Sequence, residues 1–541
     1  MKTLLLGINS KYIHPAMGVF QIYTNSKAPC EYKEFTIKDD LNNILEYINN
    51  QEFNILGFSV YIWNIAFVQT IISHISHIDT IILGGPEASY RPNDFLKYPN
   101  ISYIIKDEGE EAFNMLIEAL TTKSSLESVP NLYYRKANSF VYTYSKNPNI
   151  KKIKYDYSLI KDFKNRVVYL EASRGCCFKC AYCLASLEKG IRYLDFELVK
   201  ENILFSLNNG ARVIKFLDRS FNIKQEFMRS IIKFIQDHDN GITTYQFEVV
   251  GDQLDNETID LIKTVRKGLI RFEIGIQSLN EKTTRSVNRR QNLELLINNI
   301  NEIKDNIVIH LDLIAGLPYE NLESFINTFN RTFELYADEL QLGFLKELQG
   351  TAISITKDVH DYRFNQSPPY EVIDNKYITK DELDQIRLVE AGLNKYYNSN
   401  NFPKTMDYLF KTLKLNPYQT FLNMITYIGL DNLNKLQLDE VAKSLYDSLK
   451  DTINNKELLL FIIKQDYLFK FNMRPKIFWD QDITRKERNE VYQIYLKEFT
   501  HLNIDNLYRY SHLEKYGNNY FIVTYKPIKE IIHLNINNTK A

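Results

Sequence analysis

The sequence predicts an α/β protein in three parts: an N-terminal doubly wound, Rossmann-like parallel sheet, a central partial (β/α)6 barrel and a mainly helical C-terminal domain. Short, almost wholly apolar runs alternate with amphipathic helical segments up to about residue 120 and again, more regularly, from Val167. Such runs are typical of parallel strands that helices cover on both faces. Beyond about residue 360 the strand pattern fades and helical periodicity remains. A chain of 541 residues is also too long for one hydrophobic core.

We place the domain boundaries where this alternation changes. The N-terminal domain is expected to span 1–125, and a stretch rich in Ser, Pro, Asn and Lys at 126–165 is expected to form a linker, with room for a small hairpin. The barrel is placed at 166–355. The helical domain is placed at 360–541, with short strands near its end, and we expect it to be related to the substrate.

Six strands are predicted for the barrel, each followed by a helical pattern. Reactive groups in barrels of this kind lie at the C-terminal ends of the strands, so residues just after these runs are the candidates for chemistry. The predicted strands are 167–173, 213–218, 245–250, 269–277, 307–314 and 340–345.

Four of the five cysteines lie between Cys176 and Cys183, directly after the first barrel strand. Neighbouring cysteines rarely meet disulfide geometry, so this cluster indicates metal binding. Cys176, Cys180 and Cys183 have CxxxCxxC spacing, with which three thiolates can wrap a 4Fe-4S cluster and leave the fourth iron without a protein ligand. Such an open coordination site permits chemistry.

The alternative for this loop is a zinc ion with a distant fourth ligand. It is less favoured, because zinc sites favour paired two-by-two spacing and no matching CxxC or HxxxH pair occurs elsewhere in the chain. Cys177 falls off the spacing, and we expect it to be a buried thiol that binds no metal.

The charge balance gives no sign of a nucleic acid or membrane partner. The 66 basic and 67 acidic residues nearly cancel, so no long-range field attracts polyanions. No apolar segment approaches the length of a membrane helix, and MKTLLLGINS at the N-terminus has the pattern of a strand rather than a signal peptide. We therefore expect a cytoplasmic protein that does not contact membranes.

The cysteine loop resembles that of the radical S-adenosylmethionine (SAM) superfamily, CxxxCxΦC, with Tyr182 at the aromatic position. The resemblance implies that SAM completes the fourth iron and is cleaved reductively to a 5′-deoxyadenosyl radical. It also implies an electron donor such as flavodoxin or ferredoxin.

The same resemblance implies contacts to SAM along the strand ends. The family's Gly-Gly-Glu after the second strand is replaced by Phe216-Leu217-Asp218, where Asp218 offers an acceptor for the amino group. FEIGIQS and DLIAGLP match recurrent motifs on later strands, although Glu273 could equally be the partner of a lysine. The implied contacts are Tyr182, Asp218, Glu273, Gln277, Ser278 and Asp312.

The N-terminal domain resembles the cobalamin-binding domain of one large branch of this superfamily, through SVYIWN, LGGPEAS and DEGEEAF. The implied corrin contacts are Ser59, Gly84, Gly85 and Glu108, at strand ends where a flat macrocycle's tail could approach the backbone. The DxHxxG motif is absent, because Tyr12 stands where the aspartate before His14 would be. We expect no histidine from this motif on cobalt. The alternative is a domain that kept its fold and lost its cofactor.

These resemblances imply a radical enzyme that methylates or oxidatively rearranges an unactivated carbon, as a methyltransferase or as a cyclase or oxidoreductase. A non-catalytic sensor with a cluster and a corrin is a second class of function. An RNA-modifying methyl(thio)transferase is a third, disfavoured by the neutral charge balance. The substrate is not indicated by the sequence.

Overall fold

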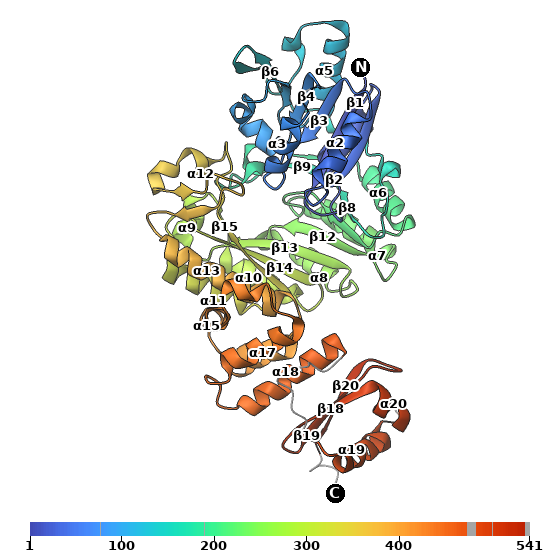
Figure 1. The fold of residues 1–541 in the computed structure, drawn as a ribbon, viewed down its shortest axis with the longest axis vertical. Coiled ribbons are helices and arrows are strands. Elements are labelled where there is room, and N and C mark those ends of the chain that lie inside the picture. The colour runs from blue at the N-terminus through green and yellow to red at the C-terminus, as the bar shows by residue number, and fades with distance from the viewer. Residues whose placement is uncertain (76, 189, 473–482, 500, 502, 536–541) are drawn as a thin grey trace. The chain divides into compact units, whose positions relative to one another are not determined.

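The computed structural model describes residues 1–75, 77–188, 190–472, 483–499, 501 and 503–535. The chain divides into two compact units (Figure 1). Unit 1 comprises Met1–Asn321 and Gly343–Thr379, and unit 2 comprises Leu322–Leu342 and Lys380–Ala541. The predicted α/β fold class is confirmed, and each unit is described by itself below.

The first sheet of unit 1 has five parallel strands in the order β2-β1-β3-β4-β5, to which β6 and β7 add in antiparallel fashion. Helices cover both of its faces, as a doubly wound sheet requires. The hairpin of β6 and β7 lies within the stretch expected to be a linker, so the sheet continues past residue 125. The strands are β1 (Thr3–Asn9), β2 (Cys30–Thr36), β3 (Ile55–Ser59), β4 (Thr80–Gly84), β5 (Ile101–Ile105), β6 (Leu132–Lys136) and β7 (Ser139–Tyr142), and the helices are α1 (Met17–Asn25), α2 (Leu41–Asn49), α3 (Ile65–Ser73), α4 (Pro86–Tyr90) and α5 (Glu110–Thr122).

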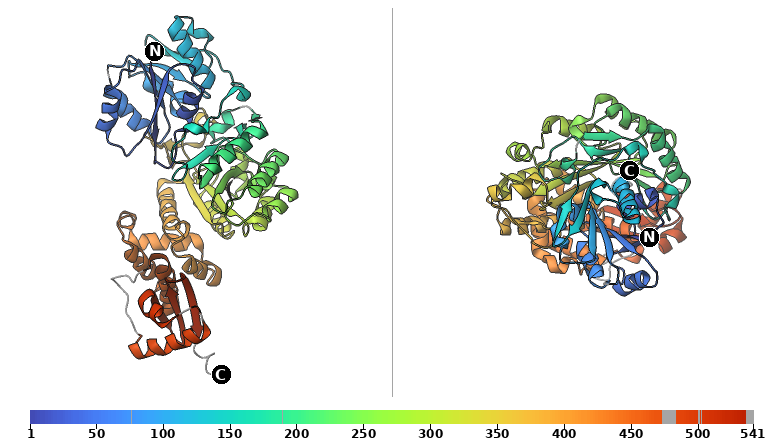
Figure 2. Two further views of the ribbon diagram at one scale, coloured as in Figure 1. Left: turned by 90° about the vertical axis from the view of Figure 1, so that its right-hand side faces the viewer. Right: turned by 90° about the horizontal axis from the view of Figure 1, so that it is seen from above.

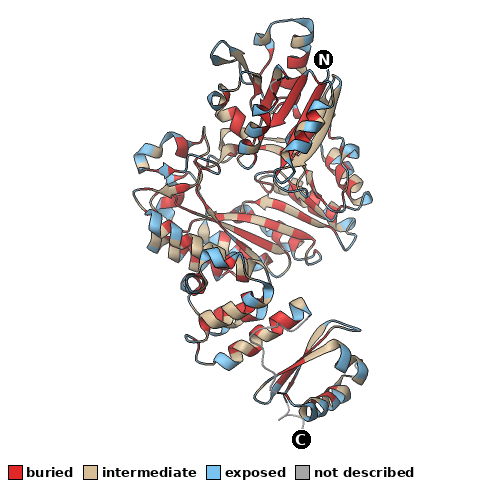
Figure 3. Cartoon of the chain, in the orientation of Figure 1, coloured by how far each residue is buried: buried red, intermediate tan, exposed pale blue. Residues whose placement is uncertain are grey.

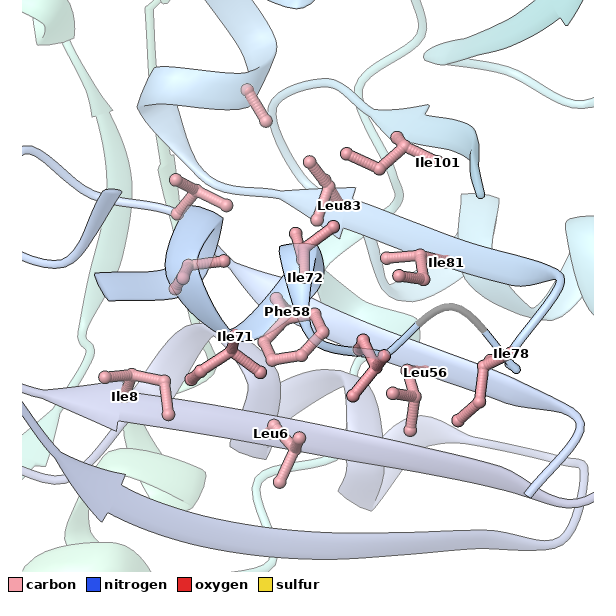
Figure 4. Packing of buried hydrophobic residues seen from close by; sticks show 14 of the residues in the cluster. Leu6, Ile8, Leu56, Phe58, Ile71, Ile72, Ile78, Ile81, Leu83 and Ile101 are labelled. Atoms are coloured by element: carbon pink, nitrogen blue, oxygen red, sulfur yellow. The ribbon is translucent and has the colours of Figure 1, made fainter. Parts of the chain in front are cut away.

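Apolar packing on the two faces holds this sheet together. On one face, Leu6 of β1 and Phe58 of β3 pack with Ile71 and Ile72 of α3 (Figure 4). On the other face, α1 and α5 supply a second cluster, which includes Phe113. Burial of each such side chain stabilises the fold by roughly 1.5–3 kcal/mol. β1 and β3 are buried at every position, which explains their almost wholly apolar sequences, whereas the edge strand β2 is half-buried and carries charged residues.

The second sheet has the order β15-β14-β13-β12-β11-β8, in agreement with the six strands that the sequence predicts. Buried and half-buried residues alternate along β12 and β13 (Figure 3). One face therefore packs on helices, and the other carries polar side chains into the barrel. The strands are β8 (Val167–Leu170), β11 (Val213–Phe216), β12 (Thr244–Val249), β13 (Ile270–Gln277), β14 (Val308–Ala315) and β15 (Glu339–Phe344), and the helices between them are α6 (Phe196–Asn208), α7 (Gln225–Asp237), α8 (Asn256–Ile262), α9 (Glu281–Ser286), α10 (Leu293–Ile303) and α11 (Leu322–Phe333).

A short antiparallel hairpin follows β8 and carries the first cysteine of the loop. It pairs β9 (Ser173–Cys176) with β10 (Gly190–Tyr193). Gly175 has φ +97°, and a Cβ atom there would collide with the carbonyl oxygen of Gly190. The close approach of the two strands therefore requires glycine at position 175.

Unit 2 is mainly helical and ends in a small antiparallel sheet, β18-β19-β20. Helix α18 packs on one face of this sheet through Phe461 and Leu468, and α19 packs on the other through Val491 and Tyr495 (Figure 2). The helices include α13 (Lys380–Gly392), α15 (Pro417–Ile428), α17 (Leu438–Leu449), α18 (Lys456–Phe471), α19 (Arg485–Glu498) and α20 (Ile504–Tyr510), and the strands are β18 (Ser511–Tyr516), β19 (Asn519–Thr524) and β20 (Glu530–Asn535).

None of the described helices is long and apolar enough to cross a membrane.

Candidate cluster and cofactor site

The cysteine loop lies at the C-terminal rim of the barrel, between β9 and β10. Cys176 and Cys180 are buried and Cys183 is half-buried. Burial raises the pKa of the Cys183 thiol, while Arg219 acts in the opposite direction. Cys177 is exposed, so the prediction of a buried thiol there is wrong. It directly follows the last residue of β9, where the chain leaves the pairing with β10.

Two arginines place positive charge beside these thiols. Nη1 of Arg289 lies 3.9 Å from Sγ of Cys180 and 3.5 Å from the hydroxyl of Tyr182, and Nη2 donates to the carbonyl of Gly275. Arg219 forms an ion pair with Glu248 at 3.7 Å and interacts electrostatically with the cysteines. Cationic neighbours favour thiolates, the form that binds metal.

Asp218 is hydrogen-bonded to the chain at the start of the hairpin of β9 and β10, which is called the cysteine hairpin below. Its carboxylate accepts hydrogen bonds from the backbone N–H of Ala172 at 3.0 Å and from the hydroxyl of Ser173 at 2.5 Å. Only 3% of the residue is exposed, and burial raises the pKa of Asp218 to about 7. The predicted acceptor for SAM is therefore already engaged by the strand that leads to Cys176.

The other predicted SAM contacts divide into two groups. Glu273 forms an ion pair with Lys215 at 2.8 Å, the alternative that the sequence left open, and Asp312 lies 3.1 Å from Nε2 of His310. The structure thus brings Glu273 and Asp312 into one row of polar residues on neighbouring strands.

Gln277 and Ser278 lie at the end of β13 and differ from each other. Gln277 has φ +68°, and its buried Oε1 has no hydrogen-bond partner among the described residues. Ser278 is fully buried and donates to Glu320 at 2.5 Å. Gln277 therefore keeps a buried acceptor atom without a partner among the described residues, whereas the hydroxyl of Ser278 is already engaged.

The predicted corrin residues gather at the C-terminal edge of the first sheet. Ser59 and Gly84 are partners in the β3–β4 register. A Cβ at Gly84 would have as its nearest neighbour the carbonyl oxygen of Ile105 at 3.7 Å, an ordinary van der Waals distance, so a methyl group fits there. Gly85 has φ +87° and lies against the backbone of Val60, so the turn requires glycine at position 85.

Glu108 lies beside this edge but faces the barrel. Its carboxylate forms ion pairs with Arg174 and Arg192 of the cysteine hairpin. A small cavity nearby is lined by Pro86, Glu87, Tyr90 and Arg91 of the N-terminal domain and by Leu184, the residue after Cys183, together with Leu348 and Gln349. The C-terminal edge of the first sheet, with Ser59, Gly84 and Gly85, is called the corrin edge below. It and the cysteine loop are therefore neighbours.

The sequence did not single out the arginines of this site: Arg174, Arg192, Arg219 and Arg289. A weak signal was present for Arg174, which stands two residues before the first cysteine. The others come from separate segments, so their convergence depends on the folded chain.

The residues present fit the implied cofactors. Cys183 lies close enough to Cys180 and to Cys176 to interact electrostatically with both. Within the described ranges, no three His, Cys, Asp or Glu side chains lie close enough together to bind one single metal ion. Thiolates that bind different irons of a cluster are spaced more widely than the ligands of one ion. The unpartnered buried atoms Oε1 of Gln277 and Nε of Arg289 suit a polar ligand such as SAM.

Three family models match the chain. The B12 binding domain matches residues 4–117, the Radical SAM superfamily residues 170–332, and a family of unknown function, DUF4080, residues 358–534. The first two models bear out the cofactors predicted from the sequence, a 4Fe-4S cluster, SAM and cobalamin.

Individual proteins are similar at low identity. An uncharacterized methyltransferase of Pyrococcus horikoshii, PH0819, is 24% identical over 200 residues, which cover 35% of this chain and only 43% of that protein. The radical SAM methyltransferase TsrM from Kitasatospora setae, with cobalamin and a 4Fe-4S cluster bound, has a TM-score of 0.58 at 15% identity, covering 68% of this chain and 78% of its own.

The cobalamin-dependent radical enzyme OxsB, with aqua-cobalamin and SAM bound, has a TM-score of 0.60 at 14% identity and covers 92% of this chain and 84% of its own. These structures share the fold. The chain thus carries a match to the B12 binding domain followed by a match to the Radical SAM superfamily, in the order that the sequence predicts.

Proposed function

We propose that this protein is a cobalamin-dependent radical SAM enzyme that methylates an unactivated carbon of its substrate. The observation that carries the proposal is the contact between the two cofactor regions: Glu108, beside the corrin edge, pairs with Arg174, two residues before Cys176. A corrin on that edge would face the cysteine loop. The methyltransferase names of PH0819 and TsrM support methylation over rearrangement.

In this proposal each group of residues has one task. Cys176, Cys180 and Cys183 would hold the cluster, and Gln277 and Arg289 would contact SAM through their unpartnered buried atoms. When bound, the cofactors supply an oxidant that abstracts hydrogen from carbon and a corrin that delivers a methyl group. The polar row of Lys215, Glu273 and the residues around them holds fixed charge inside the barrel.

Oxidative rearrangement is the second candidate reaction, because the same cofactors serve it. An RNA substrate is disfavoured by the formal net charge of −1.

The test is anaerobic reconstitution of the full chain with iron, sulfide and hydroxocobalamin, followed by reduction with dithionite or reduced flavodoxin in the presence of SAM. We expect iron for one 4Fe-4S cluster, bound corrin and reductant-dependent 5′-deoxyadenosine. Methyl transfer would also release S-adenosylhomocysteine, whereas rearrangement would not. A cluster-loaded chain that never cleaves SAM would favour the sensor function instead, and the Cys180→Ala variant is the matched control without a cluster.

A further inference from the structure

Two arginines face each other directly across the cysteine hairpin. Arg174 of β9 and Arg192 of β10 are register partners. Like charges placed opposite each other on antiparallel strands destabilise the pairing. Glu108 of the N-terminal domain offsets this repulsion, because its carboxylate accepts from Arg174 at 2.9 Å and from Arg192. The hairpin that carries Cys176 therefore depends on a carboxylate from the other domain.

Arg174 has further partners on both sides of this junction. Its Nη2 lies 2.8 Å from Glu110, and its Nε donates to Glu171 at 2.9 Å. Its side chain is only 11% exposed. A guanidinium fork can meet several carboxylates at once, and a buried charge is costly when a partner is removed. The position of Arg174 is thus set by residues from both the N-terminal domain and the barrel.

The segment that holds Glu108 is in turn tied to the corrin edge. The hydroxyl of Tyr90, in the helix that follows Gly84 and Gly85, donates to Asp107 at 2.8 Å. The backbone N–H of Asp107 donates to Ser89 of the same helix at 3.2 Å. A continuous set of contacts therefore runs from Gly84 and Gly85 at the end of β4 through helix α4 and Glu108 to Arg174.

We propose that Arg174 is a positioning residue that couples corrin binding in the N-terminal domain to the cysteine loop, so that corrin and cluster strengthen each other's binding. This inference rests on the proposed function, since it requires that both groups bind. Movement of the corrin edge shifts Glu108, and Arg174 transmits the shift to Cys176 two residues away. Coupling of this kind is reciprocal, so it can be measured from either site.

The chain offers a matched control for loss of a contact between the same two domains. Arg166, just before β8, pairs with Glu34 of β2 at 2.6 Å and is also buried. Among the described residues, its guanidinium contacts Glu34 and the ring of Tyr12, and not the cysteine hairpin. Arg166→Gln therefore removes an interdomain ion pair of similar burial without touching the strand of Cys176.

The experiment is a spectroscopic titration of the full chain with hydroxocobalamin, before and after chelation of the cluster. The quantity of interest is the ratio of the two dissociation constants. We expect the cluster-loaded parent to bind at least about fivefold more tightly than the cluster-free parent, the lower end of typical coupling. Arg174→Gln should bring the ratio close to one, Arg174→Lys should restore part of it, and Arg166→Gln should keep the ratio of the parent.

The outcomes separate the two proposals. A parent that binds no corrin overturns the proposed function and this inference together. A parent that binds corrin equally well with and without the cluster, or an Arg174→Gln variant that keeps the full ratio, overturns this inference alone. Should Arg174→Gln fail to fold or to load iron, Glu108→Gln tests the same contact from the N-terminal domain, with the same loss of coupling expected.

Discussion

Nδ1 of His14 lies 2.8 Å from the hydroxyl of Tyr169, and the two rings stack with their centroids 6.2 Å apart. His14 belongs to the loop after β1, and Tyr169 lies on β8 of the barrel. Burial lowers the pKa of His14, which favours the neutral imidazole. The histidine is thus a contact between domains.

This relationship leads to the first prediction. His14→Ala should leave the absorption spectrum of bound cobalamin unchanged, because the ring is held by Tyr169. Tyr169→Phe is the matched variant that removes only the hydroxyl and should behave likewise. A shift of the cobalt bands on losing His14 would identify it as a ligand.

The second prediction concerns the thiols. Replacing Cys176, Cys180 or Cys183 with Ala should abolish the iron–sulfur absorption after reconstitution, since each leaves only two of the three thiolates. Cys177→Ala should keep most of it, because this thiol is exposed and off the spacing. Iron content and absorbance measure both effects, and a Cys177 variant without a cluster would contradict the ligand assignment.

The third prediction concerns pH and unit 2. Asp466 of α18 accepts from the backbone N–H groups of Lys404 and Thr405 and from the Thr405 hydroxyl, and burial raises its pKa to about 6. A folded-state pKa above the unfolded value means that the native state holds more protons between about pH 4 and 6. The free energy of unfolding should therefore fall across this window, by on the order of 3 kcal/mol, and level off above it.

Denaturant unfolding of the parent and of Asp466→Asn across this pH range measures the effect as a difference in slope. Asp447→Asn is the control of opposite sign. Burial would raise the pKa of Asp447, but the hydrogen bonds and ion pairs with Lys443 and Lys450 outweigh it and lower the pKa. The ionised Asp447 therefore increases the free energy of unfolding at neutral pH, and this increase is lost as the pH falls. Identical slopes for the parent and Asp466→Asn would contradict the assignment.

Local sequence patterns were enough to predict the strands and the cysteine loop, and not enough to predict the roles of charged residues. Apolar runs and alternation depend only on neighbouring residues, and they were sufficient to predict strands such as Val167–Leu170 and Ile270–Gln277. The partners of Glu108 lie 66 and 84 positions away in the chain. Its assignment as a corrin contact followed from the resemblance carried by DEGEEAF and from its place after a strand, and neither reveals which arginines its carboxylate meets in the folded chain.

The fourth prediction separates Gln277 from Asp218. Gln277→Ala should weaken SAM binding by about tenfold while the cluster survives, since a buried acceptor would lose its ligand contact. Asp218→Ala should instead lower iron loading, because Ala172 and Ser173 lose their acceptor just before Cys176. Equilibrium dialysis with labelled SAM and iron analysis distinguish the two. Ser278→Ala, at the neighbouring position, is the control for disturbance of the strand end.

The fifth prediction uses the two adjacent glycines of β4 and its turn. Gly84→Ala should fold normally, because the nearest atom to its Cβ would be 3.7 Å away, whereas Gly84→Leu should fill the edge and abolish corrin binding with the cluster intact. Gly85→Ala should destabilise the chain by about 1–3 kcal/mol whether or not corrin is present, because its φ is +87° and its Cβ would lie 2.5 Å from the carbonyl oxygen of Val60.

Thermal unfolding and hydroxocobalamin titration of the three glycine variants separate a blocked site from a strained turn. Loss of corrin binding in Gly84→Leu at an unchanged melting temperature places the macrocycle or its tail against β4. Retention of binding in that variant would mean that the corrin lies elsewhere, or that the domain keeps the fold without the cofactor. Gly85→Ala should retain corrin binding in proportion to the fraction of folded chain, because its effect acts through the turn and the backbone of Val60.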